Sequence, residues 1–459
     1  MTVTVSNWKG DLSYNAATLV TAKSAEHIAE VVRDTANYPA PVRVKGSHHS
    51  TTRCIENPGG TVIDISGLNR ILSIDAENLS IRMQAGVHHI DAAKALEKMG
   101  LQFYVNVEIG NLTVGSGACG GTKDASYISD GQNEFGQVAS YCIGMKVVQA
   151  DGRLVEYTQD SELLPALRSS YGLLGIIVEV TYRVKPIRSM KVRHTVYRAE
   201  EFVARLDELL ALERSMMLYL FPFLDRIVVE YRYDSDVPLR SGSWQWRLRN
   251  FVWKTVSPGF GRLVGIVVPW GHARHVIYNL WNRLTMLVMR LLLRDCNSSP
   301  ADQIILYPER AGFASYTFSI WAFARESYGQ ALLDYFHFCR DYRHRTGYRC
   351  DLLNVGYSIA QDQQSLFSYT RRGPALTLDP VASGGEGWYE FLQAYNQFCH
   401  EHHGTPLFNQ TWGLTHEQVQ AAFSDEVPEF LQLRQRLDPD NRFYTAWFRE
   451  LLQGSEISA

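Results

Sequence analysis

The first 186 residues mix two hydrophobic periodicities, one typical of helices and one typical of strands. Ser24 precedes apolar residues at helical spacing, which predicts a short helix capped by this serine. Residues 41–45 (PVRVK) alternate between apolar and polar side chains, which predicts a strand. This strand should end at the polar stretch GSHHS (residues 46–50), where we expect a loop.

Short strands and turns continue the pattern. Runs 61–66, 71–75 and 79–85 predict three antiparallel strands, followed by a helix over about residues 90–99 that Gly100 ends.

The clearest hairpin is expected over residues 145–157. It turns at Asp151-Gly152, a pair that tolerates positive φ. A further strand is expected over residues 176–184, preceded by Gly175, and Pro186 marks the end of this part of the chain.

Composition narrows the class of protein. The 459 residues exceed one ordinary domain and predict two or three, and 46% hydrophobic with 20% charged residues indicates a globular chain. The 45 Lys plus Arg and 48 Asp plus Glu give a net charge of −3, which argues against nucleic-acid binding. Seven scattered cysteines without a CxxC pair predict neither a disulfide framework nor a metal site. No leader or long uncharged apolar run is present, so we expect a cytoplasmic protein.

Two glycine-rich stretches carry the candidate chemistry, residues 46–50 and TVGSGACGGT at 113–122. Without Cβ atoms, consecutive backbone N–H groups can converge on an anion such as a pyrophosphate. The alternative is a set of tight turns between strands. No Walker lysine pattern occurs, and GSGACG lacks the spacing of a nicotinamide-binding G-x-G-x-x-G unit. The spacing therefore argues against a nicotinamide-binding Rossmann domain and leaves a pyrophosphate site and tight turns as the two interpretations.

Five segments resemble, in order, the FAD-binding domain of the vanillyl-alcohol oxidase superfamily. They are PVRVKGSHHS, VIDISGLNRILSIDAENLSIRMQAGV, GNLTVGSGACGGT, IGMKVVQADGRLVEYT and SYGLLGIIVEVTYRV, over about residues 15–186. QRLDPDNRFYTAWF (435–448) is similar to the closing Asp-Pro-x-x-x-Phe segment of that family. The resemblance implies an α+β fold, with a PCMH-type FAD-binding domain of two subdomains and an α+β cap domain for substrate. The implied boundaries are 1–186 for the FAD-binding domain, 187–414 for the cap, and 415–459 for a segment that returns to the FAD-binding domain.

Within the superfamily, the chain is similar to the aldonolactone and alditol oxidases and to the decaprenylphosphoryl-ribose oxidase branch. LYPERAGFASYTFSIW (306–321) and GPALTLDP (373–380) resemble the latter. The resemblance implies an FAD-dependent oxidoreductase that transfers a hydride to flavin N5 from a C–H next to a hydroxyl or amine. We expect a fairly large, hydrophobic or lipid-linked substrate. The alternatives are a sugar, aldonolactone or alditol oxidase and, second, a non-catalytic flavin-fold binding protein.

The resemblance also implies which residues hold FAD. His49 matches the histidine that many relatives bond covalently to the flavin 8α carbon. His48 is the alternative tether, and a third possibility is that both histidines only form hydrogen bonds in the loop. The implied cofactor-binding residues are Lys45, Gly46, Ser47, His48, His49, Ser50, Gly115, Ser116, Gly117, Gly120, Gly121, Thr122, Gly175 and Ile177.

The chain departs from its relatives in a late motif. Aldonolactone and alditol oxidases carry Gly-x-Pro-His-Trp-x-Lys, whereas this chain has GTPLFNQ at 404–410. Leu407 takes the place of the histidine and Gln410 that of the lysine, so a cation that would stabilise the anionic reduced flavin is missing. This difference favours a substrate other than a simple sugar. The expected catalytic residues are Glu309, Tyr357 and Gln410, and other candidates for proton abstraction are Tyr307, His402 and His403.

Residues 244–294 contain eight Lys or Arg residues and no Asp or Glu, interleaved with aromatic residues. Within them, VIYNLWNRLTMLVMRLLLR (276–294) places apolar side chains on one helical stripe that arginines interrupt. Such a helix is typical of peripheral membrane contact. The alternative is a core helix whose arginines face solvent. The expected partners are a small-molecule substrate and, at 244–294, an anionic membrane or lipid-linked substrate, but no nucleic acid.

Overall fold

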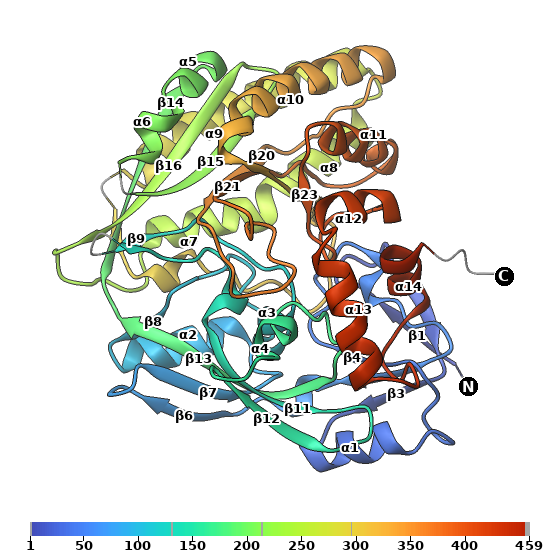
Figure 1. Cartoon of the computed structure of the whole chain (residues 1–459). Coiled ribbons are helices and arrows are strands. Elements are labelled where there is room, and N and C mark those ends of the chain that lie inside the picture. The colour runs from blue at the N-terminus through green and yellow to red at the C-terminus, as the bar shows by residue number, and fades with distance from the viewer. Residues whose placement is uncertain (1, 130–131, 213, 295, 455–459) are drawn as a thin grey trace.

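The computed structural model describes residues 2–129, 132–212, 214–294 and 296–454 of the chain. Helices and strands form two halves, each with its own sheets and hydrophobic core (Figure 1). The first half combines the N-terminal part of the chain with the C-terminal helices, and the second is built from the middle of the chain. The expected α+β class is confirmed. The residue boundaries of the domains stay a prediction.

Two main sheets form the first half. The parallel sheet contains, in spatial order, β3 (Thr18–Thr21), β5 (Thr61–Asp64) and β4 (Val42–Lys45). The antiparallel sheet contains β12 (Leu154–Thr158), β11 (Cys142–Val148), β13 (Ile176–Pro186), β7 (Ser80–Gln84) and β6 (Ile71–Asp75), with β8 (Leu101–Phe103) paired to β13. Two small antiparallel pairs are β1 (Val3–Ser6) with β2 (Ser13–Ala16), and β9 (Ile128–Ser129) with β10 (Gln132–Asn133).

One predicted strand pairing is wrong. Residues 61–64 form β5, which pairs parallel with β3 and β4 and not antiparallel with the strands that follow it. Helix α1 (Ala25–Arg33) lies between β3 and β4 in the chain, and a helical crossover of this kind lets these two strands run parallel, with β5 between them. The predicted hairpin at Asp151-Gly152 is confirmed, with Gly152 at φ 77° between β11 and β12. Ser24 caps α1, as predicted, by accepting a hydrogen bond from a backbone N–H at 3.1 Å.

The C-terminal helices close the first half. Buried side chains of α12 (His416–Ala422), α13 (Glu426–Leu437) and α14 (Ala446–Gln453) share one core with those of α1. Arg442 connects the two ends of the chain, because its guanidinium donates hydrogen bonds of 2.7–2.8 Å to backbone carbonyls at residues 31, 32 and 38. The segment similar to the closing motif of the family therefore packs directly against the N-terminal helix.

An eight-stranded antiparallel sheet forms the second half. In spatial order it contains β17 (Asn297–Ser298), β14 (Ser189–Tyr197), β16 (Arg226–Ser235), β15 (Ser215–Phe221), β20 (Asn354–Ile359), β21 (Ala375–Leu378), β19 (Trp321–Ala324) and β23 (Thr405–Pro406). Residues 216–221 of β15 carry large, mainly apolar side chains without alternation, which fits a sheet that is covered on both faces. Its alternate side chains enter two cores: Leu218 packs with the helices of one face, whereas Tyr219 packs near Met289 on the other. A separate pair is β18 (Thr317–Phe318) with β22 (Val381–Ala382).

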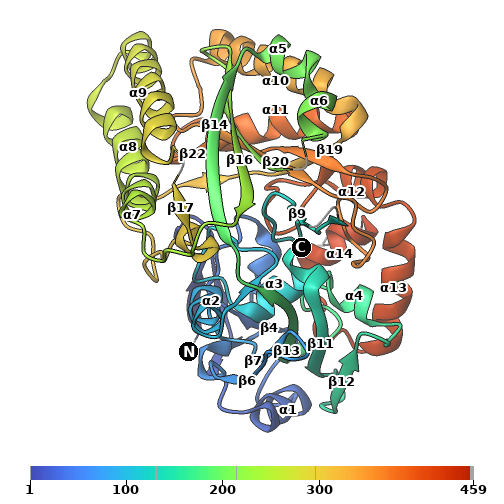
Figure 2. The same ribbon diagram turned by 90° about the vertical axis from the view of Figure 1, so that its left-hand side faces the viewer.

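Helices flank this sheet on both sides (Figure 2). One side carries α5 (Ala199–Ala204), α6 (Leu206–Leu210), α10 (Arg325–Thr346) and α11 (Trp388–Glu401). The other carries α7 (Trp244–Phe251), α8 (Ser257–Val267) and α9 (Gly271–Leu292), with a turn of π-helix at Val252–Val256. The first half adds α2 (His89–Lys98), α3 (Val114–Cys119) and α4 (Leu164–Leu167).

Helix α2 begins at a buried histidine. The imidazole of His89 stacks on Phe103 with ring centroids 4.5 Å apart, and its Nε2 has no hydrogen-bond partner among the described residues. Burial lowers the pKa of His89 to about 4 from an ordinary value of 6.5. The folded protein therefore binds fewer protons here than the unfolded chain between pH 6.5 and 4, so stability is lost as the pH falls through this window.

Replacing His89 with phenylalanine should reduce this acid sensitivity while leaving the melting temperature at pH 7 nearly unchanged. Below pH 6.5, the buried His89 lowers the free energy of unfolding of the wild type by up to about 1.4 kcal/mol per pH unit. The variant should not show this loss. Calorimetric melting at pH 7 and pH 5 measures the effect. His344→Phe, at an exposed position of α10, is the matched control. Equal acid shifts in the wild type and His89→Phe would show that His89 does not contribute.

Candidate active site

A large cavity lies between the two halves of the fold. One wall consists of the loop after β4, helix α3 with the residues that follow it, and the start of β13. The opposite wall consists of β15, β16, β20 and the inner sides of α7 to α9, together with residues 409–410.

Most of the residues expected to bind the cofactor line this cavity. They are Gly46, Ser47, His48, His49, Ser50, Gly115, Ser116, Gly120, Thr122, Gly175 and Ile177. Three expected residues do not. Lys45 forms an ion pair of 2.8 Å with Asp64 between β4 and β5, Gly117 packs against Val138 under α3, and Gly121 packs between Asn409 and Leu407.

The second glycine-rich stretch is not the loop that the sequence suggested. Its first part forms the short helix α3, and its glycines serve mainly to allow close packing. A Cβ at Gly115 would lie 2.7 Å from the Cβ of Ala85, and a Cβ at Gly46 would lie 2.6 Å from Oγ1 of Thr113. Any side chain at Gly46 or Gly115 would therefore push the wall segments apart.

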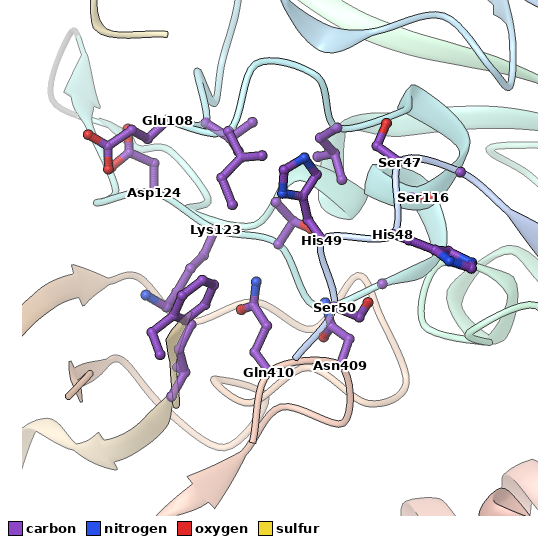
Figure 3. A pocket seen from close by; sticks show the side chains of 18 of the residues that line it. Ser47, His48, His49, Ser50, Glu108, Ser116, Lys123, Asp124, Asn409 and Gln410 are labelled. Carbon is purple, nitrogen blue, oxygen red and sulfur yellow. The ribbon is translucent and has the colours of Figure 1, made fainter. Parts of the chain in front are cut away.

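His49 and His48 both line the cavity, and their side chains point in different directions (Figure 3). Trp8 stacks on the His49 ring with centroids 5.0 Å apart, and the ring of Tyr307 meets it edge-on at 6.1 Å. Burial lowers the pKa of His49 to about 4, so its imidazole is neutral at physiological pH. The ring is thus held in one orientation, in the form that has a free nitrogen lone pair.

Nδ1 of His48 lies 3.1 Å from the backbone carbonyl of Ser6, to which it can donate a hydrogen bond, and the residue adopts a positive φ of 53°. Burial lowers the pKa of His48 to about 4 as well. The two neighbouring histidines are therefore both neutral but differ in direction and in hydrogen bonding.

The late motif lies next to the His49 loop. Thr51 N–H donates to the carbonyl of Asn409 at 3.1 Å, and the Thr52 hydroxyl donates to the carbonyl of Phe408 at 2.7 Å. These bonds bring Asn409 and Gln410 to the cavity. Leu407, in the place of the relatives' histidine, is buried in an apolar cluster and does not line the cavity.

Buried polar atoms around His49 indicate that the cavity accommodates a polar group. Within the described residues, Nε2 of His49, Oδ1 of Asn409 and Oε1 of Gln410 have no hydrogen-bond partner. Buried polar atoms are usually paired, so three such atoms beside one cavity fit a ligand rich in nitrogen and oxygen. These residues and the closely packed glycines beside them fit FAD.

Lys123 is a buried lysine that lines the same cavity as Gln410. Its side chain is 3% exposed, and Nζ lies 2.8 Å from the carboxylate of Asp379 and 3.6 Å from the ring centroid of Tyr357. All three residues line the cavity, and Lys123 faces the same space as Gln410 (Figure 3). Burial lowers the pKa of Lys123 and raises that of Asp379, while the ion pair opposes both shifts.

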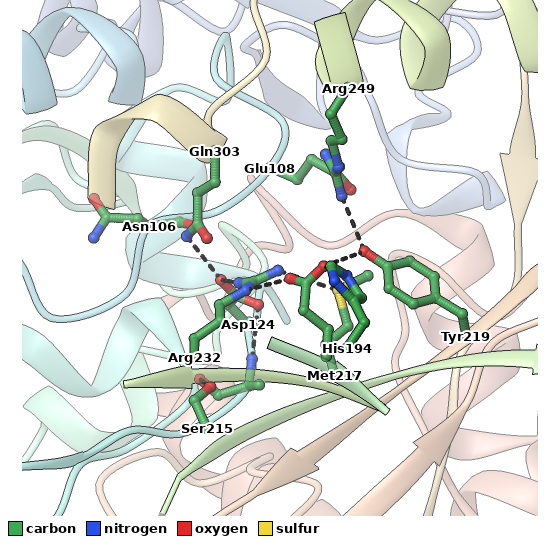
Figure 4. A network of polar contacts seen from close by, with 12 residues as sticks. Asn106, Glu108, Asp124, His194, Ser215, Met217, Tyr219, Arg232, Arg249 and Gln303 are labelled. Carbon is green, nitrogen blue, oxygen red and sulfur yellow. Dashed lines mark hydrogen bonds and ion pairs between the residues drawn. The ribbon is translucent and has the colours of Figure 1, made fainter. Parts of the chain in front are cut away.

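A network of charged side chains forms another part of the wall (Figure 4). Arg232 on β16 pairs with Asp124 at 2.9 Å, and Arg249 on α7 pairs with Glu108. All four of these residues line the cavity. Each pair joins an acid from the first half to an arginine from the second.

Buried groups behind the wall hold these arginines in place. Glu230 accepts a hydrogen bond from Nε of Arg232 at 2.6 Å and another from the Tyr219 hydroxyl at 2.8 Å, and its other ion-pair partner is His194 at 2.9 Å. Burial would raise the pKa of Glu230, but Arg232 and His194 hold it well below its usual range. The carboxylate is therefore ionised and fixes the direction of the Arg232 guanidinium.

Two of the three expected catalytic residues line the cavity, and one does not. Tyr357 and Gln410 line the cavity, but Glu309 is exposed and lies outside it, since the chain at this point runs over the surface. We therefore exclude Glu309 from the proposed site. Burial raises the pKa of Tyr357 well above its usual value, so its phenol stays protonated and cannot act as a base at neutral pH.

The other candidates for proton abstraction also lie outside the cavity lining. Tyr307 is buried beside Trp8, and His402 pairs with Asp334 at 3.8 Å at the end of α11. His403 follows it at a positive φ of 56°.

Sequence reasoning missed several residues of the site, namely Trp8, Glu108, Lys123, Asp124, Arg232 and Arg249. The only available signal was for Lys123 and Asp124, which directly follow the second glycine-rich stretch.

Comparisons with known proteins agree with this site. An FAD binding domain family matches residues 16–158, and the D-arabinono-1,4-lactone oxidase family matches residues 378–451. The chain is an FAD-dependent oxidoreductase of the vanillyl-alcohol oxidase superfamily.

Relatives of this oxidoreductase include the L-gulono-1,4-lactone dehydrogenase of Mycobacterium tuberculosis, at 24% identity over 97% of this chain and 98% of the relative. The L-gulonolactone oxidase of Bos taurus is 25% identical over 49% of this chain and 50% of the relative. Among solved structures, cholesterol oxidase from Brevibacterium sterolicum has a TM-score of 0.79 at 14% identity, covering 98% of this chain and 97% of that one. This likeness confirms the PCMH-type fold.

The relatives of the oxidoreductase bear on its substrate. Two of these relatives are named for L-gulono-1,4-lactone or L-gulonolactone, which matches the sugar, aldonolactone or alditol alternative more closely than a lipid-linked substrate. The specific substrate stays a prediction.

Proposed function

We propose that this FAD-dependent oxidoreductase oxidises an aldonolactone or a closely related cyclic sugar derivative. The observation that carries the proposal is the charged wall of the cavity, where Arg232 with Asp124 and Arg249 with Glu108 face the space beside Lys123. Hydroxyl and lactone oxygens need both donors and acceptors, and charged partners make the stronger hydrogen bonds. The whole-length similarity to an L-gulono-1,4-lactone dehydrogenase supports the same substrate class.

The cofactor and the chain have separate tasks in this reaction. FAD supplies the hydride acceptor, flavin N5. His49 would tether the cofactor, and Asn409 and Gln410 offer polar atoms to it. Lys123 holds a positive charge beside Gln410, where it favours the anionic reduced form.

The network of charged side chains holds the substrate. The guanidinium groups of Arg232 and Arg249 donate hydrogen bonds to its oxygens, and the carboxylates of Glu108 and Asp124 accept them from its hydroxyls. Tyr357, kept protonated by burial, offers a hydroxyl donor and closes the cavity against water. Orientation by several fixed polar groups places the reacting C–H toward the cofactor.

One part of the cavity supports a second candidate, an apolar alcohol. The cavity is lined there by Trp253 of the π-helical turn, Pro258 of α8 and Trp281 of α9, whose side chains are mainly apolar. A larger substrate with a lipophilic portion would contact these residues.

Anaerobic bleaching of the flavin absorbance against a substrate panel distinguishes the candidates. We expect L-gulono-1,4-lactone or D-arabinono-1,4-lactone to bleach the holoenzyme, and alditols and long-chain alcohols to do so weakly. Bleaching by long-chain or lipid-linked alcohols alone would contradict the lactone proposal. Bleaching by dithionite but by no substrate would favour a non-catalytic flavoprotein.

Arg249→Gln should raise the KM for the lactone at least about tenfold, because a charge-assisted hydrogen bond is lost. Steady-state kinetics with the best substrate of the panel measures the change. Arg247→Gln is the matched control, since this arginine lies on the same helix but is exposed. An unchanged KM in Arg249→Gln would remove Arg249 from the substrate wall.

A further inference from the structure

The helices α7 to α9 expose an unusual concentration of large apolar side chains. Of the 22 exposed large hydrophobic residues among those described, 13 lie between residues 244 and 291. They are Trp244, Leu248, Phe251, Leu263, Ile266, Val267, Trp270, Val276, Leu280, Leu284, Leu287, Val288 and Leu291. We call this surface the outer face of α7–α9. Apolar surface gathered in this way marks an interaction site.

Helix α9 has its apolar stripe turned away from the protein. Val276, Leu280, Leu284, Leu287 and Leu291 follow each other at intervals of three or four residues, so they lie on one side of the helix. Their side chains are 44%, 60%, 50%, 53% and 63% exposed. The opposite side buries Tyr278, Asn282 and Met289. The interpretation of this segment as a core helix with solvent-facing arginines is therefore wrong.

Basic residues accompany this apolar surface. Arg283 and Arg290 are exposed beside the leucine stripe, and Arg247 and Arg262 are exposed on α7 and α8. No Asp or Glu occurs from residue 244 to 294. An apolar face with positive charges at its border is complementary to an anionic lipid surface, because headgroups meet the arginines while the apolar side chains enter the acyl boundary.

A bilayer fits this face better than a second copy of the chain. A symmetric dimer places the same patch on both partners, so the arginines of one copy would face those of the other. The exposed tryptophans also fit a lipid interface: Trp244 is 62% and Trp270 is 72% exposed, and indole rings favour the headgroup level. None of the described helices is long and apolar enough to cross a membrane, so contact in the plane of the surface is the form that remains.

We propose that the outer face of α7–α9 docks the oxidoreductase on an anionic lipid bilayer. The same segment contributes Trp253, Pro258 and Trp281 to the cavity, so docking would bring this part of the cavity wall close to the bilayer. Figure 2 shows α7 to α9 together on one flank of the molecule. This proposal does not depend on the identity of the substrate.

Flotation of the holoenzyme with vesicles tests the docking. We expect at least about tenfold more protein to float with phosphatidylcholine vesicles that contain one quarter phosphatidylglycerol than with phosphatidylcholine alone, and 0.5 M salt should weaken this binding. The triple variant Leu280→Glu/Leu284→Glu/Leu287→Glu should lose it. The matched control Leu72→Glu/Leu154→Glu changes exposed leucines in the first half and should float like the wild type.

Two further measurements keep the test decisive. Arg283→Glu/Arg290→Glu removes the border charges but keeps the leucines, and it should also abolish flotation. This variant tests the docking independently if the triple leucine variant does not fold. Retained flavin absorbance shows that each variant is folded. Flotation that is absent in the wild type, or equal in the wild type and both α9 variants, would overturn the proposal. A dimer in light scattering that the stripe variant dissolves, without vesicle binding, would assign the face to self-association.

Discussion

Replacing His49 with alanine is expected to abolish covalent flavin attachment. The wild-type protein should keep its yellow colour in the pellet after acid precipitation and show a fluorescent band on a denaturing gel, whereas His49→Ala should release FAD into the supernatant. The physical reason is that the His49 imidazole is neutral and buried, and it lines the cavity. Its Nε2 has no hydrogen-bond partner among the described residues, so this nitrogen is available to bond to the flavin. Stacking on Trp8 holds this ring in place.

His48→Asn is the matched control for this variant. Asparagine tolerates the positive φ of 53° at this position, so the loop should keep its shape, and covalent flavin should be retained. Free FAD from the wild type would contradict a covalent bond altogether. Covalent flavin that survives in His49→Ala but not in His48→Asn would move the tether to His48.

Replacing Lys123 with methionine is expected to slow flavin reduction by the substrate about 10²- to 10³-fold, the usual effect of removing one electrostatic stabiliser from a water-excluded site. Lys123 is a buried cation that faces the same space as Gln410. Gln410 stands where the late motif of aldonolactone and alditol oxidases has a lysine. Anaerobic stopped-flow reduction measures the rate. Sulfite binding to the oxidised flavin should weaken in parallel, because the adduct also places negative charge on the ring.

A second substitution separates this role from a structural one. Lys123→Met/Gln410→Lys should recover part of the reduction rate, since it returns a cation to the same space. Lys146→Met is the matched control, because Lys146 is half-buried on β11 in a weaker contact of 3.8 Å with Glu179. Normal reduction by Lys123→Met, or sulfite affinity equal to that of the wild type, would mean that Lys123 does not act on the flavin.

Local patterns predicted much of the first half and of the cofactor site. The cap of α1, the Asp151-Gly152 hairpin and the strand before residues 46–50 depend on neighbouring residues, so a short window of sequence contains the necessary information. The parallel pairing of β5 was missed because a strand's partners depend on how distant segments connect, here through α1 between β3 and β4. Helix α3 was missed because tight packing on Ala85 outweighs the low helix propensity of glycine.

The motifs and their order were sufficient to predict the superfamily, the FAD cofactor and the candidate role of His49. Three features depended on the folded chain. Lys123 and Gln410 line the same cavity, although 287 positions separate them. Arg232 and Arg249 reach acids that lie more than 100 positions away in the sequence. The leucine stripe of α9 could face inward or outward with the same periodicity, and the buried Tyr278, Asn282 and Met289 show that it faces outward. Periodicity shows that a helix has two sides, but the packing of the rest of the chain determines which side is covered.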